Sequence, residues 1–420
     1  MTGNKKNLMI RNRNILLLFA LTALLGVSGC EKTYVTDESD HKGFTGINED
    51  EDDYTGGNGD TVFIKFSNNT VTSSETKNVS VHRAAATITA GGTYCISGST
   101  TDGRIIVDAP DQKDVRLVLK RASISSFSTS PLYIKEAQKV IIVTFAGTDN
   151  YLSDGSLYSY DNPEDEEPNG CIFSKSDLTF YGTGKLTVKG NFKYGINSKD
   201  GLIIKSGTIK VTSVKTAVRG KDYLLVYDGN ISVTSLGDGI KSDNASDKGA
   251  GFVLIKGGSF NINAAGDAVS AYSYLTIDYA TMALKTGGGS GISTLVQGYK
   301  GDISAKGIKS GSNITVNGGD ISINSADAAI RTDGSFELNG GNIDITTMDV
   351  AVHTAESLTV NAGSVNVVKA SCGLKSAGIG IRGGDLTLTS TVNPVYCTRG
   401  FPTGYDDGSG LIISGGTTVL

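Results

Sequence analysis

The chain has 420 residues, a formal net charge of −5, 38% hydrophobic residues and 55 glycines, but only 6 prolines, 5 cysteines and 3 histidines. Glycine at about twice its usual share, without a strict three-residue period, excludes collagen, and the patterned apolar residues exclude a wholly disordered chain. Five cysteines are too few for a disulfide scaffold, and three histidines leave little room for a histidine-rich metal centre.

Residues 1–29 have the features of a bacterial lipoprotein signal peptide. Four basic residues come first: Lys5, Lys6, Arg11 and Arg13. They precede an apolar run over residues 15–25 that is too short to span a membrane as a helix. The run ends in Leu-Gly-Val-Ser-Gly-Cys at Cys30. This predicts cleavage before Cys30 and lipidation of its sulfur, which would anchor the mature protein to the bacterial cell envelope, most simply to its outer membrane. An ordinary secretory signal with an incidental cysteine is the alternative.

Residues 30–60 are predicted to form an acidic, flexible tether. Ten acidic and two basic side chains lie between residues 31 and 60, and five of the acids are consecutive, at Glu49–Asp53. Such a stretch repels itself and cannot bury a core, so a solvated spacer is expected, with calcium binding as a weaker alternative. The body, residues 61–420, has nearly balanced charge, which does not favour a nucleic-acid partner.

Residues 171–420 repeat a short pattern at 22-residue intervals. The apolar anchors of the repeat stand at positions 172, 196, 218, 240, 269, 308, 330, 352 and 374. Five of the spacings are 22, and the longer ones indicate insertions. Three short alternating segments with glycine turns fit into each unit, which predicts one coil of an all-β parallel β-helix, with coils about 4.8 Å apart. Residues 61–170 are strand-rich but less regular, and are expected to be the N-terminal cap and first coils.

One column of the repeat is strongly basic. The residue after each anchor is expected to point outward, and six of the nine are basic: Arg219, Lys241, Lys309, Arg331, His353 and Lys375. Six aspartates lie beside this column, Asp327, Asp349 and the four candidate calcium ligands, which are Asp238, Asp243, Asp247 and Asp267. Two interpretations stay open. The face binds an acidic polysaccharide, with Ca²⁺ bridging aspartates to the sugar, or the charges form a self-neutralising surface ladder.

Tyrosines and cysteines add two further possibilities. An outward aromatic platform would favour a neutral glycan, although core or turn packing is the alternative use of the tyrosines. The candidates are Tyr223, Tyr227, Tyr272, Tyr274 and Tyr279.

Cys372 and Cys397 are about one coil apart, so a disulfide and two free thiols are both possible.

Seven segments resemble bacterial carbohydrate-binding β-helix proteins. They are residues 88–98, 102–109, 147–155, 173–179, 182–188, 238–243 and 286–290. The resemblance spans about residues 61–390. It implies a single-stranded right-handed parallel β-helix, similar in fold to the pectate lyases of polysaccharide lyase family nine, that binds polygalacturonate or cellulose and contains calcium. By this resemblance, Asp238, Asp243, Asp267 and Lys241 stand where that fold keeps calcium ligands and a basic residue. The later coils depart from the pattern, because they carry single aspartates, Asp327 and Asp349, where the family often has pairs.

The sequence therefore predicts an envelope-anchored lipoprotein that binds acidic polysaccharide, with Ca²⁺ and without catalysis. Its partners would be the glycan and, through Cys30, the membrane. The first alternative is a Ca²⁺-dependent uronate lyase in which Lys241 removes the proton next to the carboxylate. The second is a structural envelope solenoid or adhesin.

Overall fold

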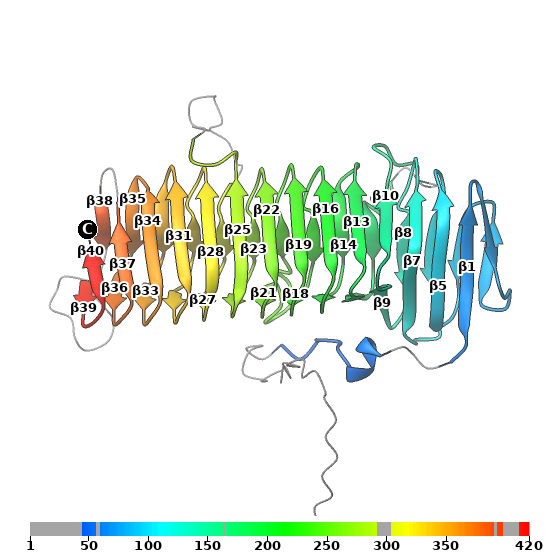
Figure 1. Ribbon diagram of the computed structural model, residues 1–420, viewed down its shortest axis with the longest axis horizontal. Coiled ribbons are helices and arrows are strands. Elements are labelled where there is room, and N and C mark those ends of the chain that lie inside the picture. The colour runs from blue at the N-terminus through cyan, green and yellow to red at the C-terminus, as the bar shows by residue number, and fades with distance from the viewer. Residues whose placement is uncertain are drawn as a thin grey trace, which may run out of the picture. The chain divides into compact units, whose positions relative to one another are not determined.

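The computed structural model describes residues 44–55, 59–160, 162, 164–291, 304–389, 393–397 and 411–419. The predicted signal peptide, Cys30 and residues 30–43 lie outside this part, as does most of the insertion between residues 286 and 308. From residue 61 onward the described chain is a parallel β-helix, which confirms the predicted fold class (Figure 1). Within the described residues no helix has the length and apolar character needed to cross a membrane.

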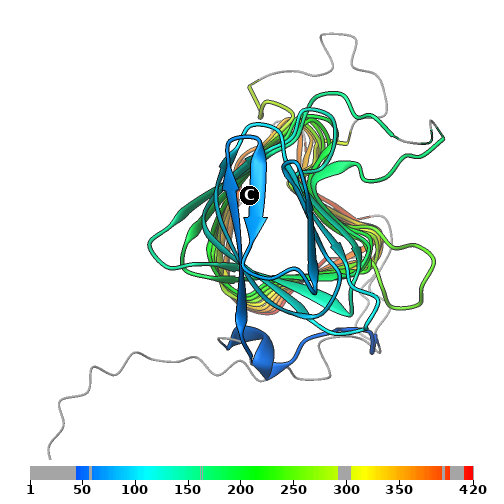
Figure 2. The ribbon, with the colours of Figure 1, turned by 90° about the vertical axis from the view of Figure 1, so that its right-hand side faces the viewer.

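Each regular coil contributes one strand to each of three faces, which Figure 2 shows in a view along the solenoid. Face 1 consists of β3 (Val79–His82), β4 (Ala85–Ile88), β6 (Arg104–Asp108), β8 (Leu132–Glu136), β11 (Gly170–Ser174), β14 (Tyr194–Ser198), β17 (Val218–Gly220), β20 (Ile240–Ser242), β23 (Val269–Ala271), β26 (Ile308–Ser310), β29 (Ile330–Thr332), β32 (Val350–Thr354), β35 (Cys372–Ser376) and β38 (Asn393–Cys397).

Faces 2 and 3 follow face 1 in every coil. Face 2 consists of β9 (Lys139–Thr144), β12 (Asp177–Gly182), β15 (Leu202–Ile204), β18 (Tyr223–Val226), β21 (Phe252–Ile255), β24 (Leu275–Ile277), β27 (Ile314–Val316), β30 (Phe336–Leu338), β33 (Ser357–Val360), β36 (Gly378–Ile381) and β39 (Leu411–Ile413). Face 3 consists of β10 (Asp149–Ser153), β13 (Lys185–Gly190), β16 (Thr208–Ser213), β19 (Asn230–Ser235), β22 (Ser259–Ala264), β25 (Ala280–Thr286), β28 (Gly319–Ser325), β31 (Asn342–Thr347), β34 (Ser364–Lys369), β37 (Asp385–Leu388) and β40 (Thr417–Val419).

The N-terminal end of the solenoid is closed by less regular strands. β1 (Thr61–Ser67) pairs antiparallel with β2 (Thr70–Ser73) and parallel with β5 (Gly92–Thr100), while β3 and β4 form an antiparallel hairpin. The long strand β7 (Val115–Ser125) pairs with both β9 and β10, so it spans the corner between faces 2 and 3. Hairpins at this end cover strand edges that would otherwise pair with other chains.

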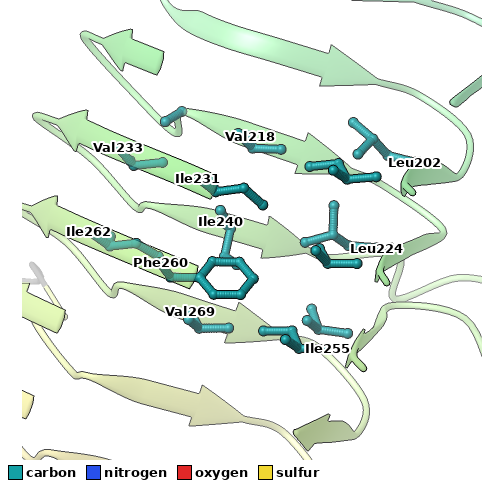
Figure 3. Close-up of a cluster of buried hydrophobic side chains, with 14 of the residues drawn as sticks. Leu202, Val218, Leu224, Ile231, Val233, Ile240, Ile255, Phe260, Ile262 and Val269 are labelled. Carbon is teal, nitrogen blue, oxygen red and sulfur yellow. The ribbon is translucent and has the colours of Figure 1, made fainter. Parts of the chain in front are cut away.

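Strict alternation of side chains places the core inside the coil. In β28, Ile321 and Ile323 are buried, whereas Ser322 between them is exposed. The same alternation in neighbouring coils stacks aliphatic residues from all three faces into a continuous core, shown for the coils around Ile240 in Figure 3. Complete burial of such a side chain stabilises the fold by about 1.5–3 kcal/mol.

A glycine corner joins face 2 to face 3. Gly341 and Gly363 have φ of +83° and +86°, a region that non-glycine residues rarely adopt. A Cβ on Gly341 would overlap the carbonyl oxygen of Gly319 in the preceding coil, and one on Gly363 would overlap that of Gly341. Glycine at this corner therefore allows successive coils to stack at strand distance.

A column of buried hydroxyl groups closes the turn after face 1. Its members are Ser174, Ser198, Ser242, Ser310, Thr332, Thr354 and Ser376. Ser198 donates to the carbonyl of Ser176 (3.2 Å) and accepts from the amide of Asp200 (3.3 Å). The column thus supplies partners to backbone groups that the short turn leaves outside the strand ladders.

Two long connections with described residues flank face 1, one on each edge. Residues 154–169 enter face 1 from face 3, and residues 243–251 leave it toward face 2. Figure 2 shows connections of this kind projecting beyond the outline of the coils. The outer surface of face 1 is therefore bordered by raised loops.

Residues 44–55, which we call the strap, lie against face 2. Phe44 and Ile47 pack on an outward-facing apolar cluster that includes Tyr223 and Phe252, and the short 3₁₀ turn η2 (Glu51–Tyr54) follows them. The strap is the blue segment below the strands in Figure 1. Over residues 44–55 the structure differs from the solvated tether predicted for residues 30–60, because Glu49, Asp50 and Asp53 pair with solenoid side chains.

Cys372 and Cys397 are not register partners on β35 and β38. Cys372 is in register with Asn393 and Cys397 with Ser376, four positions apart on adjacent strands. Cys372 is a free thiol, as are the buried Cys95 and Cys171.

Candidate functional site

The predicted basic column is a continuous stripe on face 1. Strand register places Arg219 beside Lys241, and Lys309, Arg331, His353 and Lys375 follow one another on successive strands after Ser270. Parallel pairing holds these neighbours at the strand spacing of about 4.8 Å. Stacked cations at this distance need either carboxylates or a bound anion beside them.

The N-terminal end of the column is covered rather than exposed, since Phe173 and Asn197 are buried. Ser270, which lies between Lys241 and Lys309, is buried as well. Phe173 packs against Tyr133, and Asn197 donates to Asn169 of the 154–169 connection (2.8 Å). This connection takes up the outward side of the first coils, so it excludes them from the exposed stripe.

The middle of the column is neutralised by its own aspartates. Arg219 bonds Asp243 (2.6 Å), and Lys241 bonds Asp238 (3.0 Å) and lies 3.9 Å from Asp243. Burial alone would lower the pKa of Lys241, but Asp238, followed by Asp243 and Asp267, raises it above its ordinary value. Lys241 is thereby held in its protonated form, which is unsuited to a general base.

The four aspartates predicted as calcium ligands do not form a common site. Asp238 bonds Lys241 and the amide of Asp267, and Asp267 bonds Lys309 (3.4 Å) and the amide of Lys306 (2.8 Å). Asp243 pairs with Arg219, while Asp247 bonds Asn244 within the 243–251 connection (2.7 Å). Across the described ranges no three His, Cys, Asp or Glu side chains converge as metal ligands. These contacts do not favour Ca²⁺ at the four aspartates, and the calcium expectation stays a prediction.

The C-terminal half of the column combines cations with carboxylates. It lines a pocket of about 340 Å³ whose walls are Lys306, Lys309, Ser310, Asp327, Ala328, Arg331, Asp333, Asp349 and His353. Lys306 is neutralised by Asp327 (2.5 Å) and Arg331 bonds the exposed Asp333 (2.8 Å). Lys375 lies over the ring of Tyr396. Arg331, His353 and Lys375 thus stack on successive strands, and Asp333 is the carboxylate that bonds Arg331.

The pKa of His353 is lowered by burial and by the positive charges beside it in this stack. Nη1 of Arg331 lies 2.6 Å from Nδ1 of the imidazole. Burial first, and then the charges of Arg331 and Lys375, lower the pKa of His353 to about 4. A carboxylate placed in the pocket would reverse this effect, because it would pair with all three groups.

The tyrosines do not form an outward stacking platform. Tyr223, Phe252 and Tyr274 stack on one another, with interplanar angles of 18° and 4°. Their ring faces are used against each other and their outer edges contact the strap. Tyr227 is also buried, whereas Tyr272 and Tyr279 are exposed singly.

Sequence reasoning missed Lys306 and the strap. Lys306 stands two residues before an apolar anchor, at the position that Asp238 and Asp267 hold in earlier coils. The charge at this position therefore changes from negative to positive along the chain, and this change could have identified Lys306 from the sequence. The strap had no comparable signal, because its partners are spread over five coils of face 2.

Comparison with known proteins gives three consistent results. A family profile described as carbohydrate-binding domain-containing protein matches residues 82–351. A protein of that description from Acetivibrio thermocellus is 38% identical over 225 residues, covering 54% of this chain and 79% of the relative. A solved structure of the polysaccharide lyase-like protein from C. thermocellum, a gadolinium derivative, matches with a TM-score of 0.53 and 36% identity, over 54% of this chain and 92% of that one. On this evidence the chain belongs to the carbohydrate-binding domain family.

Proposed function

We propose that this protein binds an acidic polysaccharide along face 1, without catalysis. The observation that carries the proposal is the row of basic side chains at Arg331, His353 and Lys375, which strand register places on successive coils beside the pocket. Guanidinium and ammonium groups at a regular spacing suit a polymer that carries a carboxylate on each sugar. Membership of a carbohydrate-binding family supports the same ligand class.

The shape of face 1 suits a polymer better than a small ligand. The stripe runs along the solenoid, and loops border it on both edges. Since each coil adds one residue to the stripe, a chain lying along it would meet a new side chain about every 4.8 Å. The covered first coils and the self-paired Arg219 and Lys241 leave the C-terminal coils as the principal binding region.

The lyase alternative receives less support from the geometry. A base that removes a proton must itself be unprotonated, and Lys241 is held protonated by Asp238. The similarity to a polysaccharide lyase-like protein still makes a direct test worthwhile.

We further propose that Cys30 is lipidated and holds the protein at the bacterial cell envelope.

Binding of polygalacturonate oligosaccharides by isothermal titration calorimetry tests the proposal. We expect Arg331→Ala and Lys375→Ala each to weaken binding about tenfold or more, since each removes a charge-assisted contact. Lys285→Ala is the matched control, because Lys285 is an exposed lysine on face 3, and its affinity should equal that of the wild type. Equal weakening by all three variants, or no binding at all, would show that the stripe is a self-neutralising row of surface charges and not a glycan-binding site.

The same titrations separate the remaining alternatives. Repeating them with chelator tests calcium dependence, and neutral cello-oligosaccharides test for a neutral glycan. Ultraviolet absorbance of an unsaturated product, lost in Lys241→Ala, would establish a lyase instead of a binder.

A further inference from the structure

The strap is joined to the solenoid through a buried ion cluster. Lys139, on β9 of face 2, is completely buried, and Nζ lies 2.8 Å from Oδ1 of Asp53 and 2.6 Å from Asp50. Asp53 is itself only 1% exposed. The nearest carboxylate that the solenoid supplies is Asp114, at 3.9 Å. The strap therefore provides the close counter-charges of a buried lysine.

Two further cations of the solenoid bond the strap. Lys205 pairs with Glu49 (3.2 Å) and lies 3.7 Å from the ring centroid of Tyr227, whose hydroxyl also donates to Glu49 (2.5 Å). Arg116, a buried side chain on β7, donates to the backbone carbonyl of Asp53 (2.6 Å). The acidic run is thus a set of specific partners for side chains on several coils.

Apolar and amide contacts fix the beginning of the strap. The ring of Phe44 lies 5.6 Å from that of Phe252, edge-on, and 5.9 Å from Tyr223. The side chain of Asn48 donates to Asp177 (3.1 Å), and its backbone amide donates to the Tyr223 hydroxyl (3.1 Å). The strap is therefore held at its two ends by different kinds of contact, four to five coils apart.

We propose that the strap is a permanent latch, which moves the exit point of the N-terminal segment from the β1 end of the solenoid to strands β18 and β21. A solvated ion pair would exchange readily, but removing the partners of a buried lysine leaves an uncompensated charge in the protein interior. Undocking would separate Lys139 from both close carboxylates and would also break the contacts of Lys205, Arg116 and Phe44, so the docked state is favoured. An external anionic polymer would have to replace both carboxylates to displace the strap.

The latch also sets how far the body stands from its anchor, an extension that rests on the proposed lipidation of Cys30. Fourteen peptide links separate Cys30 from Phe44, and they span at most about 50 Å. With the strap undocked, the span from Cys30 to Thr61 would reach about 110 Å. The latch thus keeps the solenoid close to the membrane and attached at its side.

Amide hydrogen exchange of the full chain, read by mass spectrometry, tests the latch directly. The amides of Asn48, Asp50, Asp53 and Thr55 donate hydrogen bonds in the docked strap. We expect them to be protected and to exchange about a hundredfold faster or more in the double variant Asp50→Asn, Asp53→Asn, which leaves Lys139 without close counter-charges. Glu51→Gln is the matched control, since Glu51 is an exposed acid in the same run and should leave exchange unchanged.

Three results would overturn the latch. They are unprotected strap amides in the wild type, equal exchange in the double variant and the wild type, or release of the strap in 0.5 M NaCl, which a buried pair resists. Unchanged exchange in β28 confirms that the solenoid stays folded in each variant. Because no strap residue lies on face 1, the double variant should bind polygalacturonate as the wild type does. Failure of glycan binding and failure of the latch are therefore separate outcomes.

For the lipidated chain on a supported bilayer, neutron reflectometry measures the gap between membrane and body. We expect a gap within about 50 Å for the wild type and for Glu51→Gln, and a wider gap for the double variant. An identical gap in all three would overturn the proposed effect on distance, whatever the exchange data show.

Discussion

At the scale of single residues, His353 and Asp200 have pKa values shifted in opposite directions, and they act on stability in opposite pH ranges. His353 is kept neutral by burial and by Arg331 and Lys375, and its pKa is lowered to about 4. Asp200 is kept protonated by burial and by the charges of Asp177 and Asp222, and its pKa is raised to about 7. Each shift makes a prediction with a definite sign.

For His353, the folded protein loses stability in acid. The unfolded chain takes up a proton near pH 6.5, whereas the folded state resists it down to about pH 4, so stability present above pH 6.5 is lost as the pH falls through this window. After allowance for solvent screening we expect a loss of about 1–2 kcal/mol between pH 7 and pH 4. Urea unfolding of the wild type and His353→Gln checks this, and parallel pH curves for the two proteins would contradict it.

For Asp200, the sign is reversed. A carboxyl whose pKa is raised in the folded state contributes stability that is fully present below pH 3.8 and is lost as the pH rises through about 7. Asp200→Asn removes this loss, so we expect its stabilising effect to grow by about 1–2 kcal/mol between pH 5 and pH 8. Thermal or urea unfolding at the two pH values measures the difference. A constant effect would show that Asp200 ionises normally.

At the scale of the strand and turn, the buried hydroxyl column makes a separate contribution from the aliphatic core. Ser198→Ala removes a hydroxyl that both donates to and accepts from the backbone. We expect a loss of about 1–2 kcal/mol in the free energy of unfolding. Ser322→Ala, at an exposed position of β28, is the control and should change it by less than about 0.5 kcal/mol. Equal changes in the free energy of unfolding for the two variants would show that the hydroxyl column contributes by packing and not by its hydrogen bonds.

The elements themselves were predictable because the repeat converts sequence spacing into register. The anchors at 22-residue intervals are enough to place Arg331 beside His353, and the alternation around Ile321 and Ile323 indicates which side chains fill the core. The pairing within the stripe was not predictable, since Lys241 and Lys375 occupy the same column. Whether an aspartate reaches each lysine depends on loop paths that have no period.

The strap was not predictable for a different reason. Acids at Glu49–Asp53 repel one another in an isolated segment, so a solvated spacer is the correct expectation for that composition alone. Their docking depends on Lys139 and Lys205, which lie about 90 and 155 residues away and in different coils. Only the three-dimensional stacking of those coils brings the cations to one face.

At the scale of the whole molecule, the functional charges fall into two groups that differ in their exposure to solvent. The stripe on face 1 is open to solvent, whereas the ion cluster beneath the strap is buried. Salt screens exposed charges at separations beyond about 8 Å at 0.15 M, but buried pairs far less. We expect polygalacturonate affinity to fall severalfold or more between 50 and 500 mM NaCl, while protection of the strap amides stays constant. Salt-independent glycan binding would contradict an electrostatic stripe.

The glycine corner has a consequence for how this molecule changes size. Gly341 packs on the backbone of Gly319, and Gly363 packs in the same way on the backbone of Gly341, so successive coils meet at equivalent corners. Removing residues 333–354 would join two equivalent interfaces and shorten the stripe by one side chain, whereas removing half that number would leave a corner without its counterpart. The length of the stripe on face 1 can thus change only by whole coils, and each coil adds or removes one residue of the stripe.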